Sequence, residues 1–299
     1  METHFKEDFY IPENKLTKGQ KLVRFYFKKV GPVLPKTTAR LFWRLFTSPR
    51  KRKITSSQKE FLGLATKTEY FLPHQKVNYV THTFGNGSKT VLLCHGWEGM
   101  TADFKQLITS IIENDCTLIA IDFPGHGSAP KAQAHLPLFI EVIEDFINHS
   151  AKEINFEALI GHSLGAAAIA MTLPKIKKTR VKKVIFLGLH PKPSDFILQY
   201  KSITQINQTL FDYCVEYAEK KAKTSLLNYD GLNHIETYSN YTILFVHDEK
   251  DTIINVSRII DFSSKIVSSE LFIGRYGGHF KHFKHPEVIL NIIGFIVKP

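Results

Sequence analysis

The sequence is poor in cysteine and has no long apolar run. Its 299 residues include three widely spaced cysteines, an odd number that argues against a disulfide framework. No stretch reaches 18 uncharged apolar residues, so we expect no membrane-spanning helix. The opening METHFKED is not followed by the apolar core of a secretory signal, and the sequence contains no internal repeat. These absences predict a protein of a reducing compartment, the cytoplasm.

The charge is distributed unevenly along the chain. The formal net charge is +11, and the first sixty residues hold 15 Lys and Arg against 5 Asp and Glu. The other 239 residues hold 24 bases and 23 acids, so the body of the protein is close to neutral. The basic character therefore belongs to an amino-terminal arm and not to the whole surface.

Residues 1–64 are predicted to form a basic helical extension. KLVRFYFKKV and TARLFWRLF interleave bulky apolar residues with Lys and Arg, as short amphipathic helices do, and the intervening GPVLP cannot continue a helix. The apolar residues could pack onto the rest of the protein, or residues 1–60 could make peripheral contact with an anionic lipid surface. The run SPRKRK could also bind nucleic acid or act as a targeting run, but no recognition module accompanies it, so we expect no nucleic-acid partner.

Residues 65–299 alternate strands and helices. KTEYFL and KVNYVTHTF predict a strand pair, and the following strands are almost continuously apolar. This pattern predicts an α/β fold with a mostly parallel central sheet and helices on both faces. Residues 191–240 interrupt the alternation of strands and helices with a predicted helical stretch rich in Tyr, Asn and Lys. The strand YTILFVHD follows it. We predict an inserted helical cap there, whose apolar residues could line a ligand site or simply pack helix against helix.

The segment LIGHSLG places Ser163 at a strand-to-helix turn. Serine is a weak nucleophile unless it is presented free of local hydrogen bonds and beside a base. Gly161 and Gly165 fit a sharp turn in which the strand and helix backbones approach too closely for side chains. The following helix would point its first N–H groups at the reaction centre. A tightly packed glycine turn without catalytic function is the alternative.

Four motifs in order resemble the α/β-hydrolase superfamily over residues 65–299. They are His95-Gly96-Trp97 after TVLLC, DFPGHGS at residues 122–128, the Ser163 turn, and an acid followed by a late histidine. The resemblance implies a nucleophile–acid–histidine order, with backbone N–H groups of Trp97 and Leu164 forming an oxyanion hole. It also implies that no metal or organic cofactor is needed. His95, Asp122 and His126 resemble positions that support loop geometry, and Glu98 receives no role.

The acid has to be chosen within HDEKD. Asp251 is followed by Thr-Ile-Ile-Asn, which resembles the step after the acid in the family except that Asn255 replaces a proline. We therefore predict Asp251 in preference to Asp248, with the function of orienting the histidine and stabilising its charged form. An acidic loop that only solubilises a turn is the other reading of this cluster.

The base is predicted to be His279, which follows the last strand and two glycines. His282 and His285 are expected at the surface before the last helix. Three histidines spaced by three residues could also bind zinc if helical, but we predict no metal site. His279 would act as general base toward Ser163 and then as general acid toward the leaving group.

These residues predict a serine hydrolase that cleaves an acyl bond of a small molecule, with a carboxylic ester as the expected substrate. A thioesterase or a lipid-ester hydrolase at a membrane surface is an alternative within the same chemistry. A binding protein that keeps the fold without catalysis is an alternative of another class. Oligomeric state and physiological substrate are not encoded in any motif of the chain.

Overall fold

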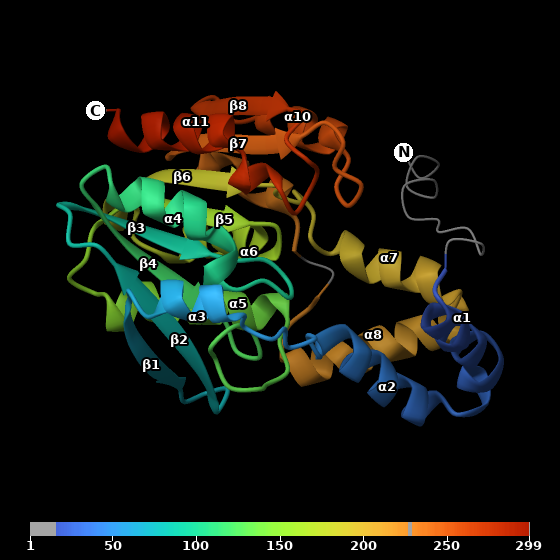
Figure 1. Ribbon diagram of the computed structural model, residues 1–299. Helices are drawn as coiled ribbons and strands as arrows, with labels where there is room; N and C mark the ends of the chain where they lie inside the picture. Colours follow the sequence, from blue (N-terminus) through green and yellow to red (C-terminus); the bar gives the residue numbers. More distant parts are fainter. Residues whose placement is uncertain (1–15, 227–228, 299) are drawn as a thin grey trace. The chain divides into compact units, whose positions relative to one another are not determined.

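The computed structural model describes residues 16–226 and 229–298, which fall into two compact units (Figure 1). The larger unit comprises Pro49–Pro191 and the residues from Gly231 onward. The smaller unit contains the described residues up to Ser48 together with those of Lys192–Asp230. No described helix is both long enough and apolar enough to cross a membrane.

The larger unit is built on one eight-stranded sheet with the order β1-β2-β4-β3-β5-β6-β7-β8. β2 is antiparallel to both of its neighbours, and all other pairs are parallel, which confirms the predicted mostly parallel sheet. The strands are β1 (Thr66–Leu72), β2 (Val77–Phe84), β3 (Lys89–Cys94), β4 (Cys116–Asp122), β5 (Phe156–His162), β6 (Val181–Leu187), β7 (Thr242–Asp248) and β8 (Ser269–Gly274).

Helices cover both faces of the sheet because the central strands are apolar on both sides. Val91 and Leu93 of β3 share one core with α3, α4 and α11, whereas the intervening Leu92 faces the other side and is also fully buried. On that other side, α5 and α6 lie against each other. The helices are α3 (Ser56–Leu62), α4 (Lys105–Ile112), α5 (Leu136–Asp145), α6 (Leu164–Thr172), α9 (Ile235–Tyr238), α10 (Val256–Ser263) and α11 (Pro286–Val297).

The smaller unit joins the amino-terminal helices to the helices of the insertion. Its elements are α1 (Lys18–Phe25), a π-helical turn (Tyr26–Val30), α2 (Pro35–Thr47), α7 (Asp195–Thr204) and α8 (Gln208–Ala222). Phe27, Phe42 and Trp43 are buried in one cluster with Leu210 and Phe211. Phe27, Phe42 and Trp43 of the extension thus pack on the inserted helices, and the smaller unit has a hydrophobic core of its own.

The unit boundaries differ from the predicted limits of 64 for the extension and 191–240 for the cap. Helix α3 belongs to the larger unit because Phe61 stacks on Phe84 of the sheet, with ring centroids 4.9 Å apart. The insertion closes earlier than predicted because the Gly231 N–H donates to the Pro191 carbonyl at 2.7 Å. This hydrogen bond joins the two ends of the inserted segment within the larger unit.

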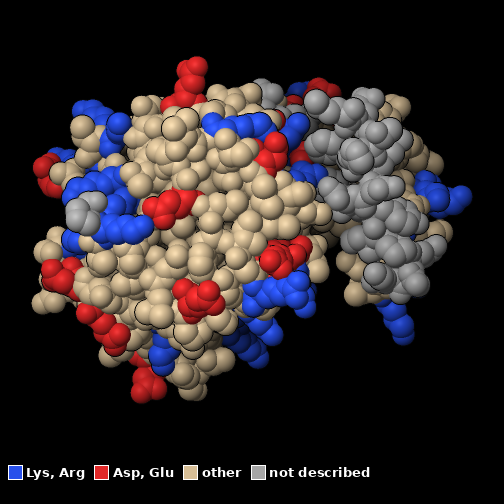
Figure 2. Space-filling view, turned by 90° about the horizontal axis from the view of Figure 1, so that it is seen from above, with Lys and Arg blue, Asp and Glu red and all other residues tan. Residues whose placement is uncertain are grey.

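The face drawn in Figure 2 carries basic and acidic side chains interspersed among uncharged ones. No single sign dominates this face, as expected for a body that is nearly neutral. The three cysteines Cys94, Cys116 and Cys214 are free and buried. They behave as small apolar residues of the cores.

Candidate active site

Ser163 occupies a strained turn between β5 and α6. Its backbone angles are φ 52° and ψ −116°, a combination that residues other than glycine rarely adopt. The Ser163 N–H donates to the Leu187 carbonyl at 2.9 Å, and its carbonyl accepts from the Ala167 N–H at 3.0 Å. The turn is therefore held by hydrogen bonds to β6 and to α6. Backbone strain of this kind is concentrated at functional sites.

The glycines on either side of Ser163 are required by close backbone approach. A Cβ on Gly161 would lie 2.5 Å from Cα of Ala166, and one on Gly165 would lie 2.4 Å from the carbonyl oxygen of Cys94. Neither distance can accommodate a methyl group. The turn thus brings the first turn of α6 against the end of β3, as the motif predicts.

His279 lies between Ser163 and Asp251. Its Nε2 is 2.8 Å from Oγ of Ser163, and its Nδ1 is 2.6 Å from Oδ2 of Asp251. The side chains of His279 and Asp251 are 2% and 0% exposed. With the proton assigned to Nδ1, the imidazole donates to the carboxylate and its Nε2 accepts from the serine hydroxyl. The three predicted side chains form one hydrogen-bonded chain.

Asp251 is held in its charged form by several donors. Its Oδ1 accepts from the N–H groups of Ile253 and Ile254 at 2.8 and 2.9 Å. Burial acts to raise the pKa of this carboxyl, but the hydrogen bond and charge of His279 and the two backbone donors outweigh burial and lower the pKa. A charged Asp251 can stabilise a positive charge that develops on His279.

Asp248, the other acid of HDEKD, supports the loop instead. Its carboxylate accepts from the N–H groups of Lys250 at 2.7 Å and Tyr276 at 2.5 Å. Burial raises its pKa, but backbone donors that include the Gly278 N–H lower it overall. Asp248 therefore joins the loop after β7 to the glycine loop that carries His279.

His162 and His282 pack behind the loop of His279. Nε2 of His162 lies 2.9 Å from the His279 carbonyl oxygen, and the rings of His162 and His282 are 5.6 Å apart. The expectation that His282 lies at the surface is wrong: it is fully buried, and burial lowers its pKa to about 4. His285 is half-buried. Among the described residues, no three His, Cys, Asp or Glu side chains are grouped as metal ligands.

The backbone N–H groups of Trp97 and Leu164 are the predicted oxyanion donors. Leu164 is the first residue of α6, so its N–H has no partner within the helix. Within residues 16–226 and 229–298, neither this N–H nor that of Trp97 donates to a protein acceptor. A Cβ on Gly96 would lie 2.9 Å from Cβ of Ser163, so the loop after β3 passes directly beside the nucleophile. Two free donors near Ser163 are what a developing oxyanion requires.

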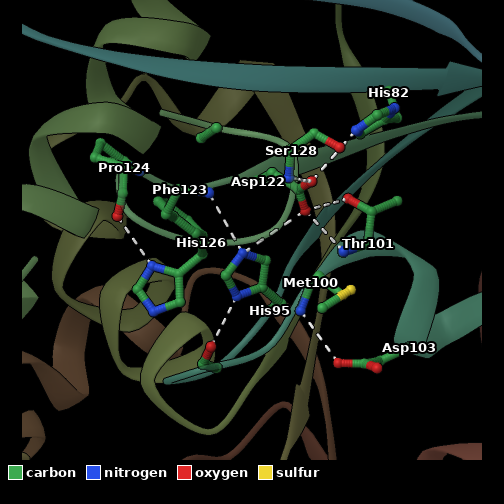
Figure 3. Close-up of polar contacts among 12 residues, drawn as sticks. His82, His95, Met100, Thr101, Asp103, Asp122, Phe123, Pro124, His126 and Ser128 are labelled. Carbon is green, nitrogen blue, oxygen red and sulfur yellow. Dashed lines mark hydrogen bonds and ion pairs between the residues drawn. The ribbon is translucent and has the colours of Figure 1, made fainter. Parts of the chain in front are cut away.

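His95 ties this loop to the turn that follows β4 (Figure 3). Its Nδ1 lies 2.7 Å from the Gly96 carbonyl oxygen, and its Nε2 accepts from the Phe123 N–H at 3.3 Å. Burial lowers the pKa of His95, which favours the neutral ring that such a donor–acceptor pair needs. Nearby, Nδ1 of His126 lies 3.0 Å from the Pro124 carbonyl oxygen, and the His126 ring packs against Trp97.

Asp122 is the centre of the same network (Figure 3). Its carboxylate accepts from the N–H and hydroxyl of Thr101, both at 2.8 Å, and from the Ser128 N–H at 2.7 Å. Burial raises the pKa of Asp122, but His82, whose Nε2 lies 3.3 Å from Oδ2, together with His95 and the Ser128 N–H, lowers it overall. The predicted supporting positions thus hold the loop after β3 against the turn after β4.

Sequence reasoning did not identify His162 or Asp103 as part of this region. His162 occupies the variable position of Gly-x-Ser-x-Gly, and nothing in the pattern indicates that its ring supports the His279 loop. Asp103 caps the short helix after Met100, whose N–H it accepts at 3.2 Å (Figure 3). Helix α3 was also not predicted, although the capping box formed by Thr55 and Gln58 was a readable signal.

Comparison with known proteins agrees with this architecture. A family model described as the alpha/beta hydrolase fold matches residues 89–228. A serine hydrolase-like protein of Dictyostelium discoideum is 26% identical over 128 residues, covering 41% of this chain and 35% of that protein. A probable serine hydrolase of Drosophila melanogaster is 25% identical over 162 residues, covering 47% of this chain and 46% of that protein. The matches thus span less than half the length of either relative.

Among solved structures, an esterase of Pyrococcus furiosus superposes with a TM-score of 0.61. It is 14% identical and covers 84% of this chain and 97% of the esterase. At this identity the likeness shows the fold alone.

Proposed function

We propose that this chain, which has the α/β-hydrolase fold, is a serine hydrolase of that superfamily and cleaves an acyl bond through an acyl-enzyme on Ser163. The observation that carries the proposal is the 2.8 Å separation between Nε2 of His279 and Oγ of Ser163. A serine hydroxyl beside a neutral imidazole can be deprotonated as it attacks. A carboxylic ester is the expected substrate class, and a thioester is the alternative.

In the proposed reaction, Oγ of Ser163 attacks the acyl carbonyl carbon while Nε2 of His279 takes the hydroxyl proton. Asp251 stabilises the resulting imidazolium through its 2.6 Å contact with Nδ1. The N–H groups of Trp97 and Leu164 donate to the oxyanion of the tetrahedral intermediate. His279 then protonates the leaving group, and a water molecule, activated by the same imidazole, releases the acid from Ser163.

Stoichiometric labelling by a fluorophosphonate probe, combined with hydrolysis of p-nitrophenyl esters and acyl thioesters of graded chain length, tests the proposal. Ser163→Ala or His279→Ala should lower turnover by ~10³-fold or more without loss of folding, because each residue belongs to a unit that acts together. Ester hydrolysis that persists in both folded variants would refute the assignment. The thioester panel decides between the two substrate classes.

The same experiment distinguishes the enzyme from a binding protein with this fold. A scaffold without catalysis has no need for a serine that reacts with a phosphonate. If well-folded protein is not labelled and Ser163→Ala behaves as the parent in every assay, the binding protein is the better reading. The free N–H groups beside Ser163 favour the enzyme, since they would have no use in a scaffold.

We also propose peripheral membrane contact through residues 1–60, of which residues 1–15 lie outside the described part of the chain. Phe27, Phe42 and Trp43 are buried, but Leu22 and Phe25, one turn apart on α1, are 69% and 60% exposed. Exposed apolar side chains within a strongly basic segment suit an anionic bilayer. This contact would bring the enzyme to lipid-like esters.

Flotation with vesicles of phosphatidylglycerol or of phosphatidylcholine tests membrane contact. We expect binding to the anionic vesicles that is lowered when Leu22 and Phe25 are both replaced by serine. Val267→Ser, which removes an apolar side chain that is 95% exposed in the larger unit, is the matched control and should change nothing. Equal flotation of all three proteins, or none at any salt concentration, would remove the lipid proposal.

A further inference from the structure

The basic run SPRKRK engages the loop beside Ser163 through its arginines. The run connects α2 to α3, and its residues from Pro49 onward belong to the larger unit. Two carboxylates of the loop after β3 accept from these arginines: Glu98, next to Trp97, and Asp103. The sequence of this run is also compatible with a nucleic-acid-binding or targeting segment. In the structure, its arginines form ion pairs with carboxylates of the same chain.

Three nitrogen atoms of Arg50 donate to the carboxylate of Glu98. The Arg50 backbone N–H donates to Oε1 at 3.0 Å, and its guanidinium donates from Nε to Oε1 at 3.1 Å and from Nη2 to Oε2 at 3.0 Å. Glu98 has a φ of 55°, a strained value for this residue type. Burial raises its pKa, but the side-chain and backbone hydrogen bonds of Arg50 outweigh burial and lower the pKa. The residue directly after Trp97 is thus fixed by a charged partner from another segment.

Arg52 makes a fork with Asp103. Its Nη1 donates to Oδ2 at 2.7 Å and its Nη2 donates to Oδ1 at 2.9 Å, and Nη1 also lies 3.4 Å from the Glu98 carbonyl oxygen. Oδ2 of Asp103 accepts in addition from the Met100 N–H at 3.2 Å (Figure 3). One guanidinium therefore contacts the loop at both Glu98 and Asp103. A planar fork of this kind fixes orientation as well as distance.

The segment is itself anchored on the turn after β4. Nζ of Lys51 donates to the Ala129 carbonyl at 2.7 Å. Pro49 packs against Gly125, where a Cβ would come within 3.0 Å of the proline ring. The segment thus contacts both the turn after β4 and the loop after β3. His95 and Asp122 contact the same loop through other residues.

We propose that Arg50 and Arg52 are positioning residues that hold the Trp97 N–H in place for the oxyanion. This inference rests on the proposed function, because it gives the arginines a purpose only if an oxyanion forms beside Ser163. Neither arginine reaches Ser163 itself. Their effect is exerted through the backbone of residues 97 and 98.

The two arginines are expected to affect the reaction rate more than the free energy of unfolding. The Arg50 side chain is 88% exposed and that of Arg52 is 46% exposed, and exposed ion pairs add little to the free energy of unfolding. A small displacement of an oxyanion donor has a much larger effect on rate, because the donor must meet the position where charge develops. Loss of either arginine should therefore slow the reaction while leaving the melting temperature almost unchanged.

The test is the rate at which a fluorophosphonate labels Ser163 in the full chain, since the phosphonyl oxygen requires the same donors. We expect Arg52→Gln to lower this labelling rate about tenfold and Arg50→Gln to lower it less. The rate of Arg52→Lys should lie between those of Arg52→Gln and the parent, because lysine keeps the charge but cannot form the two-pronged hydrogen bond. Where an ester substrate is hydrolysed, kcat should fall and KM should change little. Lys175→Gln removes an ion pair of similar exposure with Glu144, at 3.1 Å, and should leave the rate unchanged.

A double-mutant cycle tests whether slower labelling results from loss of the contact between Arg52 and Asp103. Asp103→Asn should slow labelling about as much as Arg52→Gln, and the double variant should be no slower than either. Labelling rates equal to the parent in both folded arginine variants would overturn the inference and leave the proposed function intact. Failure of the unaltered protein to be labelled would refute the proposed function and this inference together.

Discussion

Nδ1 of His279 lies 2.6 Å from Oδ2 of Asp251, and no such contact joins His279 to Asp248 among the described residues. The two acids are three residues apart and both join the loop after β7 to the glycine loop of His279, but they contact different groups there. Asp251 faces the imidazole, whereas Asp248 accepts backbone N–H groups from Lys250 and Tyr276. Asp248 is the last residue of β7, whereas Asp251 lies in the turn that follows, where its carboxylate meets the imidazole of His279.

Asp251→Asn should lower kcat by ~10⁴-fold, because an amide neither fixes the required tautomer nor stabilises the imidazolium. Asp248→Asn should affect stability more than chemistry, since it weakens the acceptor of the Lys250 and Tyr276 N–H groups. Ester hydrolysis and thermal unfolding of both variants check this division. Equal loss of activity in the two folded variants would contradict it.

Gly165→Ala should prevent stable folding or cost more than about 3 kcal/mol, because its Cβ would meet the carbonyl oxygens of Cys94 and His95 at 2.4 and 2.5 Å. Gly294→Ala is the matched control. Gly294 lies in α11 and a Cβ there would meet nothing within 4 Å, so alanine should stabilise by about 0.5–1 kcal/mol. Denaturant unfolding of the two variants measures both effects. A Gly165→Ala protein as stable as the parent would show that α6 and the end of β3 can move apart at this turn.

Phe42→Ala should destabilise the smaller unit by about 3–5 kcal/mol, because the ring is buried among the aromatic side chains shared by α2 and α8. Phe25→Ala, at a site 60% exposed, should change stability by no more than about 0.5 kcal/mol. Limited proteolysis and calorimetry of the two variants compare them directly. If Phe42→Ala is as stable as Phe25→Ala, the extension and the insertion do not share a core.

His135→Asn should reduce the loss of stability on acidification. His135 caps α5 by accepting the Leu138 N–H at 3.1 Å, and burial lowers its pKa to about 4. Between pH ~6.5 and ~4 the unfolded chain binds a proton at this histidine more readily than the folded chain, so stability falls as the pH is lowered through that range. Asparagine keeps the capping acceptor without titrating.

Unfolding free energies of parent and His135→Asn at pH 7, 5.5 and 4.5 check this prediction. The two proteins should be similar at pH 7, and the variant should lose less stability at pH 4.5. A parallel decline of both proteins would mean that His135 does not contribute to the acid sensitivity.

Much of the fold follows from local pattern. The strands β4 (CTLIAID) and β5 (FEALIGH) are among the almost continuously apolar strands that the sequence predicts, because buried parallel strands are apolar on both faces. The short helix α3 was missed because its seven residues give little periodicity, and only its capping box indicated a start. His282 was misplaced because spacing along a loop does not reveal that it turns inward beneath His162.

The sequence by itself determined the order of the motifs, the alternation of strands and helices, and the glycines that Ser163 requires, because these depend on neighbours within a few positions. Only the tertiary structure decided which acid contacts His279, which helices share a core with the amino-terminal extension, and that Arg50 and Arg52 have carboxylate partners. Those outcomes depend on residues that lie from a few tens to more than a hundred positions apart in the chain. Their proximity is set by sheet order and packing, which no short stretch of sequence encodes.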